Sequence, residues 1–215
     1  MIALDAFILS HTTEPVDIPD QSLIDSFLPE RKQPYVFRAG DPITMGNIPS
    51  SLKEQMRMRW DVHESLKAAK RVIMEVDQEW SRLTGRSYGG LIECYRCSDA
   101  RYFIMGAGAW VGDMREAVEL LRSEGYDVGL IKLRYVRPFP AEELAEAVKG
   151  AKGVVVFDRA VSPGSAGPLY LDTVAHLAAQ NVRVPIKNAL AGIAGVDVTY
   201  EDIAGVVRSF VNEVE

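Results

Sequence analysis

A regular alternation of apolar runs and helical patterns after residue 100 is the feature that most constrains how this chain can fold. The centres of the apolar runs recur about 26 residues apart, the length of a strand–helix repeat with short loops. Because the runs are apolar throughout, they favour a sheet covered on both faces. We therefore predict an α/β domain with a mostly parallel sheet and three layers. Strands are expected at 101–106, 128–134, 153–157 and 183–187, and helices at 112–124, 140–149, 167–180 and 200–212.

Residues 51–83 predict one long helix, because they contain neither Pro nor Gly and their apolar residues recur at spacings of three and four. At about 1.5 Å per residue this helix spans about 50 Å, more than one small domain offers. His63 on the apolar face is interpreted as a packing residue rather than a ligand. The face consists of Leu52, Met56, His63, Leu66, Ile73, Val76, Trp80 and Leu83.

The first 50 residues give weaker signals. Residues 2–9 (IALDAFIL) predict a short buried strand, so that the chain is expected to begin partway through a larger fold. Six prolines between Pro15 and Pro49 argue against a long helix or a central strand. A short helix is predicted at 21–28, with Asp20 as its N-cap. The stretch is either a linker or an arm that lies over a partner, since its three aromatic residues are costly in a free linker.

These signals divide the chain into three parts. Residues 1–50 form the end of a preceding segment and a proline-rich arm, residues 51–96 form the long helix and a connector, and residues 97–215 form the α/β domain.

The net charge is −6 with scattered basic residues, which argues against nucleic acid as a ligand. No apolar run approaches the roughly 20 residues that cross a bilayer, and no signal peptide is recognisable. With two cysteines and no export signal, the expected location is the cytoplasm.

The glycine-rich stretch GAGAWVG, residues 106–112, suggests a nucleotide-binding loop. Its glycines, Gly106, Gly108 and Gly112, are one residue too far apart at the third position for a dinucleotide fingerprint. The next strand ends in basic residues instead of the usual carboxylate, which leaves a 2′-phosphate of NADP open as a ligand. The alternative, which we favour, is that the glycines only turn strand into helix.

Three further groups of residues are candidates for a site. Arg134 and Arg137 follow the second strand, and they either clamp a carboxylate or phosphate or pair with acidic residues at an interface. Asp158 and Arg159 end the third strand as site residues or as a structural ion pair. The loop behind them, with Ser162, Gly164 and Gly167, precedes a helix whose free N–H groups suit an anion or a partner backbone.

Catalytic and metal-binding patterns are not found in the sequence. Cys94 and Cys97 form a single CxxC pair, whereas a structural zinc needs four ligands and a thioredoxin-like pair opens a helix after a strand. We interpret their spacing as coincidence. Ser162 and Ser165 have no histidine near them in the sequence, and we assign no catalytic and no metal-binding residue to this chain.

In their order along the chain, several motifs resemble the α subunit of 2-oxoacid:ferredoxin oxidoreductases, of which pyruvate:ferredoxin oxidoreductase (pyruvate synthase) is the best known. The resemblance covers nearly all of the chain, although the family usually carries Gly and Arg where Ala194 and Val196 stand. The motifs are Asp5–His11 with Glu14–Val16, Gly85–Gly89, Gly106 with Gly108, Leu133–Arg134 with Arg137–Pro140, Asp158–Arg159 with Ser162, Gly164 and Gly167–Leu169, and Gly192–Thr199.

The resemblance implies a fold similar to the transketolase C-terminal domain and a share in the oxidative decarboxylation of a 2-oxoacid, pyruvate first, to acyl-coenzyme A, a reaction of anaerobic metabolism. It implies that thiamine diphosphate and Mg²⁺ lie between a pyrimidine-binding domain and a β subunit. The [4Fe-4S] clusters belong to a ferredoxin-like δ subunit, which with a γ subunit and ferredoxin completes the list of partners. This chain alone is then inactive, binds no cofactor by itself, and enters a homo-oligomer through the complex.

Two other functions stay open at this point. The first is a free-standing module that binds NADP or another phosphate ligand at Gly106–Gly112. The second is a scaffold of the same fold in an unrelated complex. The site residues named above are expected to face a partner or coenzyme A, and the sequence does not identify the 2-oxoacid.

Overall fold

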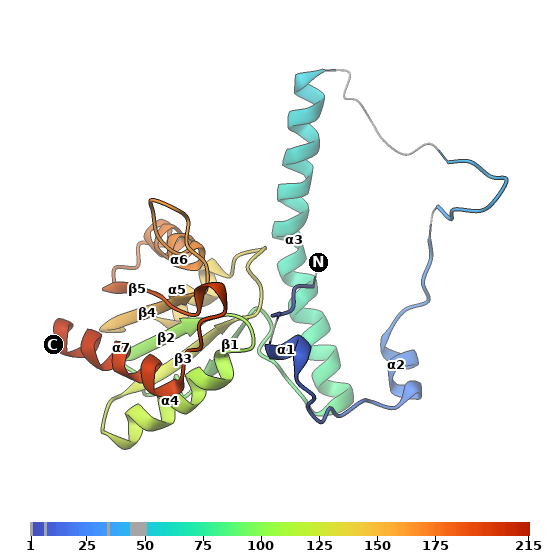
Figure 1. Cartoon of the computed structure of the whole chain (residues 1–215). Coiled ribbons are helices and arrows are strands. Elements are labelled where there is room, and N and C mark those ends of the chain that lie inside the picture. Colours follow the sequence, from blue (N-terminus) through green and yellow to red (C-terminus); the bar gives the residue numbers. More distant parts are fainter. Residues whose placement is uncertain (1, 7, 34, 44–50) are drawn as a thin grey trace. The chain divides into compact units, whose positions relative to one another are not determined.

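The computed structural model describes residues 2–6, 8–33, 35–43 and 51–215. The chain forms two compact units. The first, here the sheet unit, comprises Met1–Glu14 and Tyr88–Glu215, and the second, the helix unit, comprises Pro15–Ser87. Both are drawn in Figure 1. Among the described residues, no helix has the length and apolar character needed to cross a membrane.

The sheet unit is built on five strands in the order β1-β3-β2-β4-β5. Strands β2, β3, β4 and β5 run parallel to one another, and β1 is an antiparallel edge strand on β3. The α/β class with a mostly parallel sheet is therefore confirmed. The strands are β1 (Ile92–Tyr95), β2 (Tyr102–Gly106), β3 (Val128–Leu133), β4 (Gly153–Asp158) and β5 (Ile186–Leu190).

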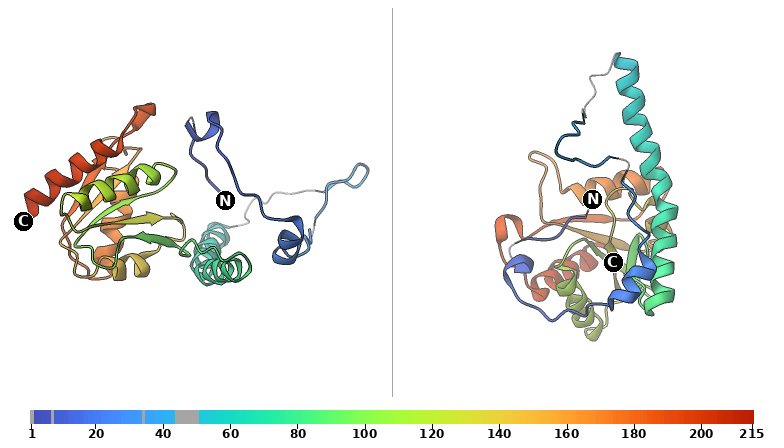
Figure 2. Two further views of the ribbon diagram at one scale, coloured as in Figure 1. Left: turned by 90° about the horizontal axis from the view of Figure 1, so that it is seen from below. Right: turned by 90° about the vertical axis from the view of Figure 1, so that its right-hand side faces the viewer.

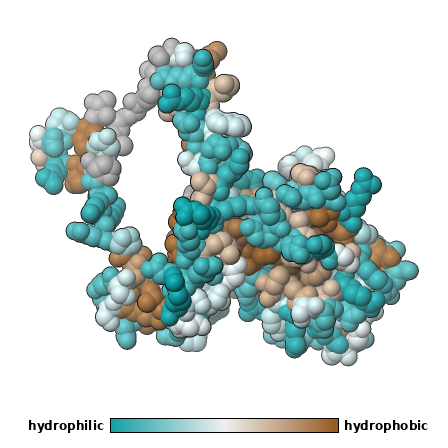
Figure 3. Space-filling view, turned by 180° about the vertical axis from the view of Figure 1, so that it is seen from behind, coloured by the Kyte–Doolittle hydropathy of each residue, from teal (hydrophilic) through white to brown (hydrophobic). Residues whose placement is uncertain are grey.

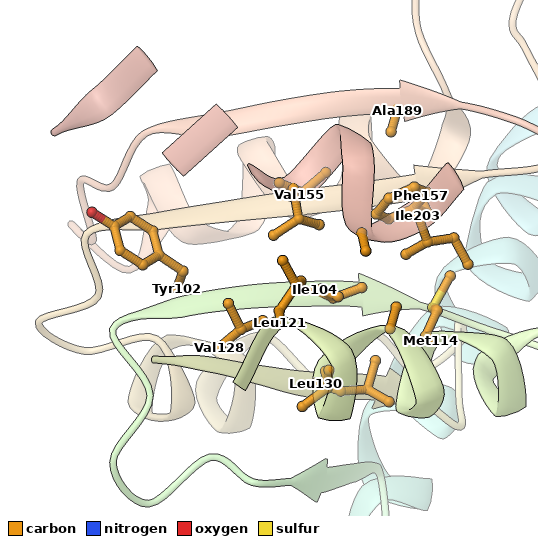
Figure 4. Close-up of a cluster of buried hydrophobic side chains, with 14 of the residues drawn as sticks. Tyr102, Ile104, Met114, Leu121, Val128, Leu130, Val155, Phe157, Ala189 and Ile203 are labelled. Carbon is orange, nitrogen blue, oxygen red and sulfur yellow. The ribbon is translucent and has the colours of Figure 1, made fainter. Parts of the chain in front are cut away.

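Helices cover both faces of this sheet, so the unit has three layers (Figure 2). Alternate strand residues belong to different cores, as the pleat requires. Ile104 of β2 packs with α4 (Val111–Ser123) and α7 (Tyr200–Val214), whereas its neighbours Phe103 and Met105 pack with α5 (Ala141–Ala147) and α6 (Pro168–Ala179). Figure 4 shows the first of these cores, in which Leu121, Phe157 and Ile203 meet between the helices and the sheet.

Local signals fix where the helices begin. Thr199 caps α7, because its side chain accepts the N–H of Asp202 while the carboxylate of Asp202 accepts the N–H of Thr199. Pro168 opens α6 at the first turn, where its missing donor costs nothing. A short 3₁₀ turn, η1 (Ile193–Gly195), follows β5 and leads toward α7.

The helix unit contains α2 (Gln21–Phe27) and the long α3 (Leu52–Thr84). Both predicted helices are confirmed. Ser51 caps α3 through the N–H of Glu54, and Gly85 ends it in the left-handed conformation. Phe27 of α2 packs edge-on against Trp80 of α3, with ring centroids 5.0 Å apart. Figure 3 shows hydrophobic side chains gathered over α2.

Two expectations about secondary structure were wrong, and one strand was not predicted. Residues 2–6 are not a buried strand, because no strand of the described residues pairs with them and Ile2 is 89% exposed; α1 (Ile8–His11) follows as a single helical turn. The strand expected at 183–187 begins at Ile186, because Pro185 has no N–H to donate to a ladder. Strand β1 was missed, since it has only four residues and lies at the edge.

The predicted division at residues 50 and 96 stays a prediction about independent domains. Part of the proline-rich stretch, Pro34 and residues 44–50, lies outside the described residues, as does Phe7. Asp20 takes the N-cap position of α2, but its side chain makes no capping hydrogen bond there.

Candidate functional site

The carboxyl ends of β2 and β4 are adjacent in the sheet, which brings the glycine turn beside the Asp158 loop. Ligands of open α/β sheets generally bind outside this edge. A shallow cleft of about 250 Å³ lies here within the sheet unit. It is lined by Asp5, Ala107, Trp110, Phe157, Asp158, Arg159, Ala160, Pro168 and Leu169.

Asp158 is buried, with 2% of its surface exposed, and it holds the start of α6. Its carboxylate accepts the N–H groups of Leu169 at 2.8 Å and Tyr170 at 3.1 Å, and the side-chain amide of Asn188 at 3.1 Å. Burial raises the pKa of Asp158, and these hydrogen bonds lower it in part. The side chain therefore replaces an N-cap for α6 and occupies the N–H groups that an outside anion would use.

Gly167 is required beside this carboxylate. A side chain at Gly167 would overlap the carboxylate of Asp158. Its N–H donates to the side-chain oxygen of Asn188 at 2.9 Å, so the turn before α6 is fixed on both sides. The loop in front is a compact turn, in which the N–H of Ser162 donates to the carbonyl of Ala166 at 3.0 Å, and Gly164 has a φ of +78°.

Arg159 is the basic residue that lines the cleft. Its guanidinium lies 5.3 Å from the ring centroid of Trp110 and 3.8 Å from the carboxylate of Asp5. Trp110 is itself fixed by a hydrogen bond of 2.7 Å from its indole nitrogen to the carbonyl of Ala107 and by an edge-on contact with Phe157. About a third of the Arg159 side chain (35%) is exposed, so the cation is oriented and yet open to a partner.

The glycine turn is shaped by close packing. A side chain at Gly106 would lie 2.6 Å from Met114, and Gly108 has a φ of +91°, a conformation that favours glycine. The N–H of Ala109, which follows Gly108, donates to the carboxylate of Asp5. Gly112 lies inside α4 with open space around it. The N–H of Ala109 in this turn is thus engaged by a carboxylate of the same chain.

The two arginines after β3 have intrachain partners. Arg137 pairs with Asp172 of α6 at 2.7 Å. Arg134 donates to the carbonyl of Gly90 at 2.7 Å and lies 5.4 Å from the ring centroid of Tyr88. The structure therefore brings together Asp158, Arg159 and the glycine turn, and it places Arg134 and Arg137 in separate structural contacts.

Sequence reasoning missed three residues of this edge: Asp5, Trp110 and Asn188. Trp110 stands in the glycine turn, and its size there was the one local signal available. Asp5 contacts the turn although more than 100 residues of sequence separate them, and no local pattern indicates such a contact.

Among the described residues, no three His, Cys, Asp or Glu side chains gather in a way that holds a metal ion. Two cysteines are too few for a [4Fe-4S] cluster, so the chain's own residues do not fit the metal groups that the resemblance implies.

The fold and this edge define an open α/β domain with a shallow, arginine-bearing cleft at the carboxyl ends of its parallel strands. Residues 100–203 match the model of one family, pyruvate:ferredoxin oxidoreductase core domain II. The resemblance found in the sequence is thereby confirmed.

Similar proteins extend this match to the whole chain. The chain is 38% identical to ketoisovalerate oxidoreductase subunit VorA of Pyrococcus horikoshii, over 100% of this chain and 55% of that protein. It is 37% identical to pyruvate synthase subunit PorA of Methanothermobacter thermautotrophicus, over 97% of this chain and 53% of that protein. The chain thus spans about half the length of the curated relatives it matches.

Two solved structures are partly similar. One is 2-oxoglutarate:ferredoxin oxidoreductase from Magnetococcus marinus with 2-oxoglutarate, coenzyme A and succinyl-CoA bound, at 20% identity and a TM-score of 0.47, covering 75% of this chain and 24% of that chain. The other is an inactive β4 tetramer of a split-gene transketolase, at 17% identity and a TM-score of 0.45, covering 55% of this chain and 40% of that chain. The fold class rests on the sheet itself rather than on these scores.

Proposed function

We propose that this chain is the transketolase C-terminal-like part of the α subunit of a 2-oxoacid:ferredoxin oxidoreductase, in which it serves assembly rather than chemistry. The complex would convert a 2-oxoacid, with pyruvate as first candidate, to an acyl-coenzyme A and pass the electrons to ferredoxin. The observation that carries this proposal is the sequence identity of 35–38% to PorA and VorA subunits along nearly the whole chain.

The geometry of the carboxyl edge supports a role without chemistry. Of the two acidic residues that line the cleft, Asp158 accepts hydrogen bonds from the start of α6, and Asp5 pairs with Arg159. Arg159 is a partly exposed cation of the cleft, and an arginine stacked on an aromatic ring suits the recognition of a carboxylate or phosphate. We therefore assign Arg159, Ser162 and Gly164 to a surface that faces a partner subunit or coenzyme A, with Asp158 and Gly167 shaping it.

The cofactors and partners follow from the same proposal. Thiamine diphosphate and Mg²⁺ would be held by the pyrimidine-binding domain and the β subunit, and the [4Fe-4S] clusters by the δ subunit, with a γ subunit completing the complex. Two copies of the complex would associate into a homo-oligomer in the cytoplasm. No step of the reaction is assigned to a residue of this chain.

Anaerobic co-purification tests this function. A tagged copy of the full chain, expressed in its own host, should retain a thiamine-binding subunit, an iron–sulfur subunit and a pyrimidine-binding domain on one column. A chain that retains none of these three would refute the role. A complex of unrelated composition would instead support the scaffold alternative.

The NADP-binding alternative gains no support from the related proteins, which are oxidoreductase subunits by name. It also has to displace Asp5 from the N–H of Ala109. Calorimetric titration of the full chain with NADP and NADPH decides the matter, since we expect no heat of binding at submillimolar ligand. A saturable binding heat with either nucleotide would revive this alternative.

A further inference from the structure

Two cysteines lie outside the carboxyl-edge site and have no role in the proposed function. Cys94 is the third residue of edge strand β1 and is exposed, whereas Cys97 follows the end of that strand and is partly buried. Both are free thiols. From the sequence alone we interpret their CxxC spacing as coincidence. Their placement in the fold indicates instead that the two thiols act as a pair.

The two thiols lie on the same face of the sheet. Cys94 stands directly opposite Ile131 in the antiparallel pair of β1 and β3, and residues opposite each other point to one face. Ile131 belongs to the core beneath α5 and α6. Ile92, two residues before Cys94, packs against that core, as the pleat predicts, and Cys97 packs against it too.

A fixed bend returns the chain from Cys94 toward Cys97. Arg96 adopts a left-handed conformation with a φ of +55°. Helix α4 holds this bend at two points: Glu119 pairs with the guanidinium of Arg96 at 2.9 Å, and Arg122 donates to the carbonyl of Arg96 at 2.9 Å. The thiol of Cys97 is thereby held near the sheet, 3.3 Å from the carbonyl oxygen of Leu130.

The two thiols also influence each other chemically. A hydrogen bond from Cys97 lowers the pKa of the Cys94 thiol to about 7, against burial and the charge of Glu93, which raise it. The same hydrogen bond and burial raise the pKa of Cys97. The exposed thiol, with its lowered pKa, is therefore the better nucleophile of the two.

We propose that Cys94 and Cys97 are a redox-active pair that closes to an intramolecular disulfide by exchange with a low-molecular-weight disulfide. The Cys94 thiolate attacks one sulfur of the small disulfide, and one small thiolate leaves. Cys97 then loses its proton and attacks the Cys94 sulfur, which releases the second small thiolate. The two protein thiols are oxidised, and the small disulfide is reduced to two thiols that carry the two protons.

Oxidised glutathione is the probe that tests this pair in the full chain. After acid quench and alkylation of the remaining thiols, mass spectrometry of the wild-type chain should show the loss of two hydrogens and no lasting glutathione adduct. Cys97→Ala should instead accumulate the mixed disulfide on Cys94, whereas Cys94→Ala should leave Cys97 reduced and open to alkylation after denaturation. A wild-type chain that keeps a glutathione adduct, or that stays reduced, would overturn the proposal.

The lowered pKa of Cys94 can be tested separately, through the rate at which its thiol is alkylated. With a pKa of about 7 instead of the ordinary 9.0, the thiolate fraction of Cys94 at pH 7 is larger by about 50-fold, and lower intrinsic nucleophilicity offsets most of this gain. Cys97→Ala should therefore slow alkylation of Cys94 by iodoacetamide at pH 7 by about fivefold. Cys97→Ser keeps a donor and should slow it less. Equal rates in wild type and Cys97→Ala would contradict the assigned order of attack.

Discussion

The long helix α3 and the shorter α4 are held by different forces, although both are amphipathic. Five of the 13 residues of α4 are buried against the sheet and α7. None of the 33 residues of α3, all of which the structure describes, is buried. Instead α3 has a capping serine, a terminating glycine and pairs one turn apart, such as Arg71 with Glu75 at 2.7 Å.

The contrast teaches that the sheet unit is defined by tertiary packing and α3 largely by its own sequence. In the sheet unit, each strand shares its two faces with separate cores, so a change in one residue is felt by several elements. In α3, each cap or side-chain pair stabilises the helix by a fraction of a kcal/mol to about 1 kcal/mol. Matched substitutions in the two units should therefore change stability by different amounts, and these differences can be ranked by measurement.

The largest difference is expected for leucine truncation. Leu121 of α4 is fully buried, whereas Leu66 of α3 is 40% exposed. Leu121→Ala should lower the free energy of unfolding of the sheet unit by about 2–5 kcal/mol, through lost burial and a cavity. Leu66→Ala should change it by less than about 0.5 kcal/mol. Hydrogen exchange of the amides of β2 and β4 measures both, and similar losses in the two variants would refute the contrast.

Glycine substitution gives the next effect. Gly167→Ala places a methyl group on the carboxylate of Asp158 and should cost about 1–3 kcal/mol of stability, since the start of α6 loses its acceptor. Gly112→Ala in α4 meets open space and should instead stabilise by about 0.5–1 kcal/mol. Urea unfolding of both variants tests this.

A double-mutant cycle locates the cause of the Gly167 effect. If the clash with the carboxylate is the cause, adding Asp158→Ala should reduce the further cost of Gly167→Ala by at least about 1 kcal/mol. Independent costs in the double variant would show that the backbone of the turn, rather than the carboxylate, requires glycine.

Helix caps should give the smallest effect. Thr199→Ala removes the cap of α7, which packs into the core, and should lower the stability of the sheet unit by about 1 kcal/mol. Ser51→Ala removes the cap of α3 and should reduce helicity by circular dichroism without changing the unfolding of the sheet unit. A Ser51→Ala variant that destabilises the sheet unit as much as Thr199→Ala would show that the units unfold together.

The sequence predicted those parts of the fold that depend on periodic patterns. Helix α3 and strands β2, β3 and β4 carry such patterns within themselves and were found within a few residues. The run at 2–9 is as apolar as a strand, but a strand exists only where another one pairs with it. Strand β1 shows the converse, because four residues, of which three are partly buried and one is exposed, become a strand through their pairing with β3.

The candidate site could likewise be predicted where a local pattern marked its residues, but not where tertiary contacts define it. Asp158, Arg159 and the glycines were each predicted as candidates at the ends of strands, and the structure brings them together because the ends of adjacent parallel strands meet at one edge. The contact of Asp5 with the glycine turn depends on the tertiary fold alone. So does the pair of Arg137 with Asp172, which removes that arginine from the cleft. Long-range contacts of this kind decide which of the predicted site residues stay available to bind a ligand or a partner.

The Arg159→Ala variant in the assembled complex tests most directly whether this chain serves assembly rather than chemistry. We expect a weaker association of the complex or a raised KM for coenzyme A, because the exposed guanidinium of the cleft is lost. The thiamine-dependent release of CO₂ from the 2-oxoacid, measured without coenzyme A, should stay within about threefold of wild type in whatever complex still forms. Arg159→Lys keeps the charge and serves as the control. If Arg159→Ala assembles normally and yet loses decarboxylation by several orders of magnitude, the edge is catalytic and the assigned role is wrong.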